Sequence, residues 1–305
     1  IIYDMYLKAK SCVKVNSFSK VSEFFTSYAG VRQGENLSPI LFSLFLNDLN
    51  QFLSEHFSGL NTLSTIVSNT LSDSDVEFYF KLYILLYADD TVIFAESADE
   101  LQNALDAMSN YCNVWQLQVN PSKTKIVVFW KSKAGLRNLP TFYFEGNLLE
   151  VVDNFSYLGA KFSYNGKFVR TKSHLLEQAR KAMFSVIVKA RKLDLPINMQ
   201  IHLFDTMIAP ILLYSSEVWG IENVDMIDKF QLKFYKLVLN LKQSTPNCML
   251  YGELGILPLS IQIKSRILCF WNKILNSKHE KISHILYNTS LTLYNRNIIN
   301  LPWIS

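Results

Sequence analysis

Two adjacent aspartates, Asp89 and Asp90, have the most distinctive chemistry in this sequence. They separate two short apolar runs, LYILLYA and TVIFA, which predicts a β-hairpin with the carboxylates at its tip. Tight hairpin turns favour Gly or Asn, and neighbouring like charges repel each other. A divalent cation removes that repulsion, and Mg²⁺ prefers carboxylate oxygens while leaving open positions for phosphate. The pair therefore indicates a metal site, with an ordinary exposed turn as the alternative for the dipeptide alone.

A glycine-rich segment, GVRQGENLSPILF, lies upstream of the aspartates. Glycines such as Gly34 let the backbone approach a ligand closely, and Arg32 and Gln33 can donate hydrogen bonds to phosphates or base edges. Ser38 and Pro39 predict the start of a helix, with Ser38 as its N-cap. The apolar run that follows predicts that this helix is buried. Alone the segment is a weak signal, because many helices begin this way.

The elements that must position these residues form a mixed unit and then a helical one. Ser97 and Glu100 predict a capping box, and the helix behind it has an apolar stripe of Leu101, Leu105, Met108, Cys112 and Trp115. Strands are predicted at 124–130, 142–144 and 148–152. Helical patterns then cover about 198–219, with a kink at Pro210, 223–242 and 258–276. We expect an α+β fold, with an antiparallel sheet and packed helices in residues 1–165 and helices alone in 166–305.

Composition limits the classes of protein that fit. The chain has 305 residues, 49% of them hydrophobic and 18% charged, as in a folded globular protein. Its apolar runs are far shorter than the roughly 18–20 residues that span a bilayer, so no membrane contact is expected. The four cysteines lack CxxC spacing, which argues against a zinc site or a disulfide framework.

The net charge of +4 conceals two halves of opposite sign. Residues 1–153 contain 11 Lys and Arg against 17 Asp and Glu, whereas residues 154–305 contain 19 against 9. The segment from Lys161 to Lys192 has a single acid, Glu177, among nine basic residues. An acidic half followed by a basic half suits a metal site beside a polyanion, although a solvated charged face is the alternative.

Taken together, these segments resemble the ordered motifs of reverse transcriptases. GVRQGENLSPILFSLFLNDL, followed about 40 residues later by YADD, resembles motifs B and C of that family. NPSKTK at 120–125 resembles motif D, and FSYLG at 155–159 resembles the primer-grip motif E. LYGELGILPLSIQIKSRILCFW at 250–271 is similar to a segment behind the polymerase domain of non-LTR (LINE-type) retrotransposons, and its residues indicate no chemistry. The resemblance implies a partial right-hand polymerase palm at 1–165, followed by a helical thumb and C-terminal extension at 166–305.

The resemblance also implies roles for individual residues. Asp89 matches the motif C ligand of two Mg²⁺ ions, with Mn²⁺ as an alternative, and Asp90 beside it is a second candidate ligand. Lys123 matches a lysine near the pyrophosphate, although a solvated lysine is the alternative. The nucleotide and template pocket matches Arg32, Gln33, Gly34, Tyr87 and Ala88. The primer grip matches Tyr157, Leu158 and Gly159, for which core packing is the competing explanation. The duplex backbone would be held by Lys161, Lys167, Arg170, Lys172, Arg180, Lys181, Lys189, Arg191 and Lys192.

One family element is missing. Motif A of the family supplies the first catalytic aspartate, yet the only aspartate before Gly30 is Asp4, whose surroundings IIYDMYLK are typical of the helix after motif A. The chain also begins at Ile1 rather than Met. We therefore expect a fragment without fingers or motif A, which does not polymerise alone.

Two functions of different classes stay open. The first is an RNA-directed DNA polymerase fragment that works by two-metal nucleotidyl transfer in its full-length parent, on an RNA template, a DNA primer and deoxynucleoside triphosphates. The second is a catalytically inactive nucleic-acid-binding remnant, or a co-opted palm and thumb. A carboxylate-pair hydrolase is disfavoured, because adjacent aspartates cannot flank a substrate from opposite sides. The resemblance implies an intracellular location, with the nucleus favoured by the family's integration into DNA.

Overall fold

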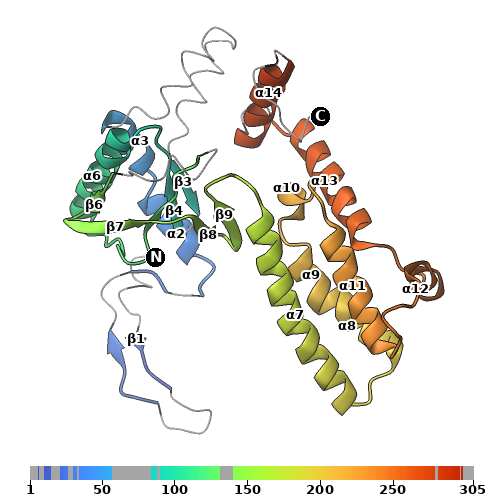
Figure 1. Cartoon of the computed structure of the whole chain (residues 1–305). Helices are drawn as coiled ribbons and strands as arrows, with labels where there is room; N and C mark the ends of the chain where they lie inside the picture. The colour runs from blue at the N-terminus through green and yellow to red at the C-terminus, as the bar shows by residue number, and fades with distance from the viewer. Residues whose placement is uncertain are drawn as a thin grey trace.

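The computed structural model describes residues 6, 10–14, 21–26, 30–32, 34–56, 84–87, 90–130, 140–278, 281–295 and 297. Within them the fold is α+β: small sheets with helices come first, and helices alone follow from residue 169. Figure 1 shows the sheet-bearing part and the helical part on either side of a central hairpin, β8 (Asn154–Tyr157) and β9 (Ala160–Ser163).

The segment behind the glycine-rich turn forms two helices rather than one buried helix. They are α2 (Ser38–Phe45) and α3 (Leu49–His56). The predicted N-cap is wrong, since Leu37 occupies that position and Ser38 Oγ donates to the carbonyl of Arg32, 2.5 Å away. Leu44 stays 66% exposed, so the prediction of a buried helix fails for α2. Leu49 and Leu53 of α3 are buried.

The predicted hairpin is confirmed, but its connection lies one residue earlier than predicted, so Asp90 belongs to a strand and not to the tip. Strands β3 (Ile84–Tyr87) and β4 (Asp90–Ile93) pair antiparallel, with Tyr87 opposite Asp90. Asp90 is thus the first residue of β4. The connecting residues, 88–89, lie outside the described part of the chain. A further short antiparallel pair is formed by β1 (Lys10–Ser11) and β2 (Phe25–Thr26).

Helix α6 (Ala98–Trp115) organises the core of the sheet-bearing part. Half of its predicted capping box is present: Ser97 Oγ accepts the amide hydrogen of Glu100, whereas the Glu100 carboxylate accepts from the amide of Glu96 and not from that of Ser97. The centre of this core is a residue outside the predicted stripe, Tyr111, which is fully buried and donates to Asp48 Oδ1 at 2.6 Å. Burial, and then the Asp48 carboxylate, raise the pKa of Tyr111. The predicted Trp115 is instead 38% exposed.

A three-stranded sheet packs against α6. Its strands are β5 (Lys125–Ile126), β6 (Phe142–Phe144) and β7 (Asn147–Val151), in the order β5-β7-β6. The β6–β7 pair is the predicted antiparallel hairpin, whereas β5 runs parallel to β7 and is much shorter than the predicted strand. Phe142, Phe144 and Leu149 join the residues buried by α6.

The helical part begins with α7 (Val169–Lys192), which follows the β8–β9 hairpin directly (Figure 1). The elements after it are α8 (Ile197–Leu203), the π-helix η2 (Phe204–Ile208), α9 (Ala209–Leu212), α10 (Ser216–Trp219), α11 (Asp225–Val238), α12 (Asn247–Leu254), α13 (Leu259–Leu275) and α14 (Ile282–Asn295). The predicted helix at 198–219 is therefore divided. Its kink takes the form of a π-helical segment just before Pro210, a residue that lacks an N–H and clashes with the preceding turn of an α-helix.

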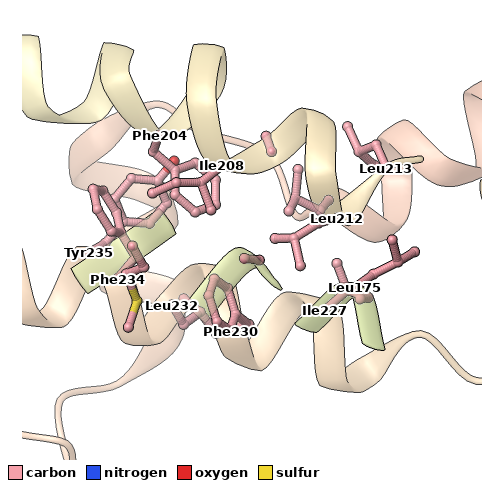
Figure 2. Close-up of a cluster of buried hydrophobic side chains, with 14 of the residues drawn as sticks. Leu175, Phe204, Ile208, Leu212, Leu213, Ile227, Phe230, Leu232, Phe234 and Tyr235 are labelled. Atoms are coloured by element: carbon pink, nitrogen blue, oxygen red, sulfur yellow. The ribbon is translucent and has the colours of Figure 1, made fainter. Parts of the chain in front are cut away.

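A second apolar core holds these helices together (Figure 2). Three aromatic rings meet in it: the Phe204 centroid lies 4.8 Å from that of Phe234 and 5.3 Å from that of Tyr235. Helix α7 contributes Leu175, Ala179 and Met183 to the same cluster. Among the helices described, none alone has the length and apolar composition of a membrane span, and α12 and α13 meet those criteria only as a pair bent by 69°.

Substitution by alanine should have opposite effects on stability at two glycines of the helical part. A Cβ at Gly220 would lie 2.2 Å from Ile263 Cγ2 and 2.4 Å from the Ser216 carbonyl oxygen, so Gly220→Ala should lower the free energy of unfolding by about 1–3 kcal/mol. Gly252, inside α12, has open space, and Gly252→Ala should raise that free energy by up to about 1 kcal/mol. Urea denaturation of both variants measures the difference. Equal shifts would contradict the close packing of α10 against α13.

Candidate nucleic-acid interface and catalytic hairpin

The structure brings the β3–β4 hairpin close to the end of β8, although the two are far apart in sequence. The carboxylate of Asp90 is exposed and near enough to Tyr157 to act on its hydroxyl. Burial raises the pKa of Tyr157, and the negative charge of Asp90 raises it further. Residues that the sequence assigned to motif C and to the primer grip therefore lie within electrostatic range of each other.

The predicted metal ligands are only partly within the described structure. Asp90 offers an exposed carboxylate, which fits a hard cation, whereas Asp89 lies outside the described residues together with Gln33 and Ala88. Of Tyr87 only the backbone is described. Among the described residues, no three His, Cys, Asp or Glu side chains lie close enough together to hold a metal ion.

The glycine-rich turn is open on its outer side. Gly34 has φ of 89°, a conformation that favours glycine, and a Cβ there would meet no atom within 4 Å. The predicted donor Arg32 is exposed, but its Nη1 lies 2.9 Å from Glu35 Oε1 in an ion pair. Tyr6 donates from its hydroxyl to the other oxygen of Glu35. A nucleic-acid phosphate would have to compete with Glu35 for this guanidinium.

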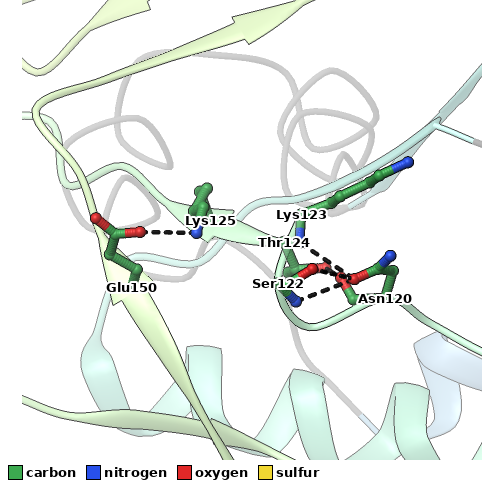
Figure 3. A network of polar contacts seen from close by, with 6 residues as sticks. All are labelled: Asn120, Ser122, Lys123, Thr124, Lys125 and Glu150. Carbon is green, nitrogen blue, oxygen red and sulfur yellow. Dashed lines mark hydrogen bonds and ion pairs between the residues drawn. The ribbon is translucent and has the colours of Figure 1, made fainter.

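A compact turn presents Lys123 (Figure 3). Asn120 Oδ1 accepts hydrogen bonds from the amides of Ser122 and Lys123 and from the Ser122 hydroxyl. Thr124 Oγ1 donates to the Asn120 carbonyl at 3.0 Å. Figure 3 shows the Lys123 side chain directed away from this network, while Lys125 pairs with Glu150 at 2.7 Å between β5 and β7. The turn thus fixes the backbone of Lys123, and no carboxylate of the described residues forms an ion pair with its exposed ammonium.

Helix α7 supplies most of the predicted contacts to a nucleic-acid backbone. Its buried side packs into the helical core, and its other side carries exposed cations. Arg170, Lys181 and Lys192 recur every eleven residues, which is about three turns or 16 Å along a helix. Lys181 lies 3.2 Å from Glu177, and this pairing lowers the pKa of the Glu177 carboxyl. The cations exposed on α7 or just before it, without an ion pair to any described carboxylate, are Lys167, Arg170, Arg180, Lys189, Arg191 and Lys192. Lys161 on β9 is half-buried.

Lys172 does not belong to this exposed set. It is 3% exposed, and its Nζ donates to the carbonyls of Glu222 and Asn223 at 3.2 and 3.3 Å. The Glu222 carboxylate lies 3.9 Å away, and the Trp219 ring centroid 5.9 Å. Burial lowers the pKa of Lys172. Its ammonium ties α7 to the loop before α11, so in this structure it is not available to a phosphate.

Tyr214 is a residue of this region that sequence reasoning missed. Its hydroxyl donates a hydrogen bond to the carbonyl oxygen of Leu158 in the β8–β9 turn. Its ring covers Gly159, where a Cβ would lie 3.1 Å from Tyr214 Cε1. No periodicity or motif marks this tyrosine, because it lies in the short break between α9 and α10.

Comparison with known proteins identifies the family. The chain matches the model of the reverse transcriptase (RNA-dependent DNA polymerase) family over residues 2–162, more than half of its length, and belongs to that family. It is similar to the RNA-directed DNA polymerase from mobile element jockey of Drosophila melanogaster, with 24% identity over 75% of this chain and 24% of that protein.

Two further relatives are of the same kind. A Retrovirus-related Pol polyprotein from type-1 retrotransposable element R2 of Popillia japonica is 23% identical over 81% of this chain and 39% of its own length. A probable RNA-directed DNA polymerase from transposon X-element of Drosophila melanogaster is 23% identical over 79% of this chain and 25% of its own length. The chain thus spans well under half of these relatives, and it is a reverse transcriptase domain of the LINE type, as its motifs predict. No solved structure matches it.

The effect of the Asp90 charge on Tyr157 can be tested by titrating the tyrosine. Asp90→Asn should lower the pKa of Tyr157, because the phenolate no longer forms beside a negative charge, while burial keeps the pKa above its usual value. NMR of the ¹³C-tyrosine-labelled chain follows this pKa. Tyr251 is the control: burial raises its pKa and the Asp228 carboxylate raises it further, so it should respond to Asp228→Asn and not to Asp90→Asn. Identical Tyr157 titrations with and without the Asp90 carboxylate would contradict the electrostatic coupling between the two hairpins.

Proposed function

We propose that this chain takes part in RNA-directed DNA synthesis, as the palm and thumb of a polymerase. The observation that carries the proposal is the match to the reverse transcriptase family over residues 2–162. Asp90, on the hairpin of motif C, also lies within electrostatic range of Tyr157, beside the turn of motif E. A polymerase needs its metal-binding carboxylates next to the group that holds the primer end, since the attacking 3′-hydroxyl must reach the metal. The two separate apolar cores support a division into palm and thumb.

The residues have distinct roles in this proposal. Reverse transcriptases generally use divalent metals, and two Mg²⁺ ions, or Mn²⁺, would activate the 3′-hydroxyl and stabilise the leaving pyrophosphate. Asp89 and Asp90 would hold them. Lys123 would place its positive charge near the pyrophosphate, and the open turn at Gly34 would admit the template and the incoming nucleotide. The turn of Leu158 and Gly159 would support the primer end.

The exposed side of α7 would hold the duplex. Each cation that replaces a condensed counterion on a phosphate adds affinity that depends on salt and not on sequence. The three-turn spacing of Arg170, Lys181 and Lys192 distributes these contacts along the helix instead of concentrating them at one phosphate. Lys172 is excluded, because its ammonium is buried and bound to backbone carbonyls.

Neutralising the exposed cations tests this face. In a variant with Gln at Arg180, Lys189, Arg191 and Lys192, the slope of log K against log salt for an RNA–DNA duplex should fall by close to one for each phosphate that is no longer neutralised. Fluorescence anisotropy at several salt concentrations measures the slope. The matched control has Gln at Lys229, Lys233, Lys264 and Lys273, four exposed lysines on α11 and α13, and removes the same charge. If both variants change the slope equally, net charge rather than α7 governs binding.

The polymerase proposal itself is tested by primer extension. The polypeptide translated from the whole reading frame that encodes this chain should extend a DNA primer on an RNA template when Mg²⁺ is present. Asp89→Asn should reduce extension at least a hundredfold, because a weakened metal site no longer positions the reacting groups. Asp99→Asn, at an exposed site in the first turn of α6, should keep full activity. Retention of activity by Asp89→Asn would exclude the proposed metal site, and no extension by the unaltered polypeptide would favour a nucleic-acid-binding remnant.

A further inference from the structure

The β8–β9 turn contains a backbone conformation that its sequence does not favour. Leu158 has φ of 48° and Gly159 of 80°, so both central residues of the turn are left-handed. Such turns select Gly, Asn or Asp, and a bulky residue with positive φ is strained by about 1–3 kcal/mol unless its surroundings hold it. Leu158 is 37% exposed, so burial of its side chain is incomplete and does not account for the conformation. The pairing of β8 with β9 constrains this turn, and a contact from outside the hairpin can hold it further.

Tyr214 provides that contact from the helical part of the chain. The hydroxyl of Tyr214 donates to the carbonyl oxygen of Leu158, the residue with the strained φ. The tyrosine ring also lies against Gly159, where even a methyl group would come within 3.1 Å of Cε1. Glycine is therefore required at position 159 by its φ and by the ring. The turn and the tyrosine ring fit each other closely.

Tyr214 is itself held by residues of two helices. It lies in the break between α9 and α10, where Ser215 also has a positive φ of 52°. Trp219, 2% exposed, donates from Nε1 to the Tyr214 carbonyl at 2.8 Å. Arg266 of α13 donates from Nη1 to the carbonyl of Leu213 at 2.8 Å. Two successive carbonyls of the break, those of Leu213 and Tyr214, are thus fixed, and this restrains the backbone that carries the ring.

We propose that Tyr214 and Arg266 are positioning residues for the primer end. Arg266 fixes the carbonyl of Leu213, this orders the break, and the ordered break holds Tyr214 on the turn of Leu158 and Gly159. This inference rests on the proposed function for its purpose, since the turn would support the primer. It also assigns a role to the segment 250–271, whose residues alone indicated no chemistry. Helix α13, far along the chain, then determines how firmly the primer terminus is placed.

The closing experiment uses four variants. Tyr214→Phe keeps the ring and removes the donor, whereas Arg266→Gln removes the guanidinium. The double variant tests whether the two residues act in series, and Arg266→Lys restores a single donor. The controls are Tyr143→Phe on β6, whose hydroxyl has no hydrogen-bond partner in the described part of the chain, and Lys264→Gln on α13. Hydrogen exchange of the peptide 154–163 is measured in the 305-residue chain, which requires no catalysis.

Each single variant should speed exchange of this hairpin by about fivefold, the loss expected for one hydrogen bond. The double variant should exchange no faster than the faster single variant, because contacts in series are not additive. Arg266→Lys should recover part of the protection. In primer extension, kcat should fall by about tenfold or more while the Kd for the duplex stays constant, because the reacting end is misplaced but α7 still binds.

The outcomes separate the two proposals. Unchanged exchange in Tyr214→Phe, or additive effects in the double variant, would overturn the positioning network. A change of Kd with constant kcat would overturn the role at the primer end. If the unaltered polypeptide extends no primer, the proposed function fails, and the exchange measurements still decide whether the network exists. Should Arg266→Gln not fold, Tyr214→Phe and Arg266→Lys decide by themselves.

Discussion

The rotation of α7 about its own axis is the constraint on which the other features depend. Ala179, Met183 and Ala190 are completely buried, so the helix cannot turn without exposing apolar surface or burying charge. Burying an uncompensated charge costs several kcal/mol, far more than a surface ion pair contributes. One side of the helix is thereby committed to the core of the helical part. The other side must carry the cations, and the N-terminal end of α7 must continue from the β8–β9 hairpin.

Two polar contacts at that end make the junction rigid. Thr171, which is fully buried, donates from Oγ1 to the carbonyl of Lys161 on β9 at 2.6 Å. Lys172, the next residue, bonds to carbonyls of the loop before α11. Buried donors of this kind stabilise one geometry strongly, because any rearrangement would leave a desolvated group without a partner. The hairpin and the helical core are therefore joined by hydrogen bonds as well as by the chain, and Tyr214 adds a third contact at the turn of the hairpin.

Local patterns in the sequence predicted local structure well. The β3–β4 hairpin, the N-cap at Ser97 and the strands of the β6–β7 hairpin all follow from periodicity and turn chemistry, which act over a few residues. The family was also readable, because its motifs are short and ordered. The basic segment was predicted as one set of exposed cations. The charge in a sequence does not reveal which cation faces the core, and in this structure Lys172 is the one that is buried.

What the sequence could not predict depends on contacts between distant segments. Tyr111 can be fully buried because its hydroxyl donates a hydrogen bond to the carboxylate of Asp48, which is far from it in the sequence. The apolar run after Ser38 divides into two helices, which apolar composition alone does not distinguish from one. No sequence pattern marks Tyr214, because its hydroxyl donates to the carbonyl of Leu158, which is 56 positions away in the sequence. Tertiary contacts overrode local preference at each of these positions.

The π-helix η2 has a consequence for how this region tolerates insertions and deletions. A π turn contains one residue more than the α turn that it replaces, and successive residues of an α-helix are related by a rotation of about 100°. Because the wider turn takes up this extra residue in about the same rotation, loss of one residue from 204–208 would restore a regular α-helix and rotate the residues beyond it very little. Leu212 would stay in the core, and the break that carries Tyr214 would still face β8 and β9. A deletion within a regular helix such as α7 would instead rotate everything beyond it by about 100°, so η2 is where this region best tolerates the loss of one residue.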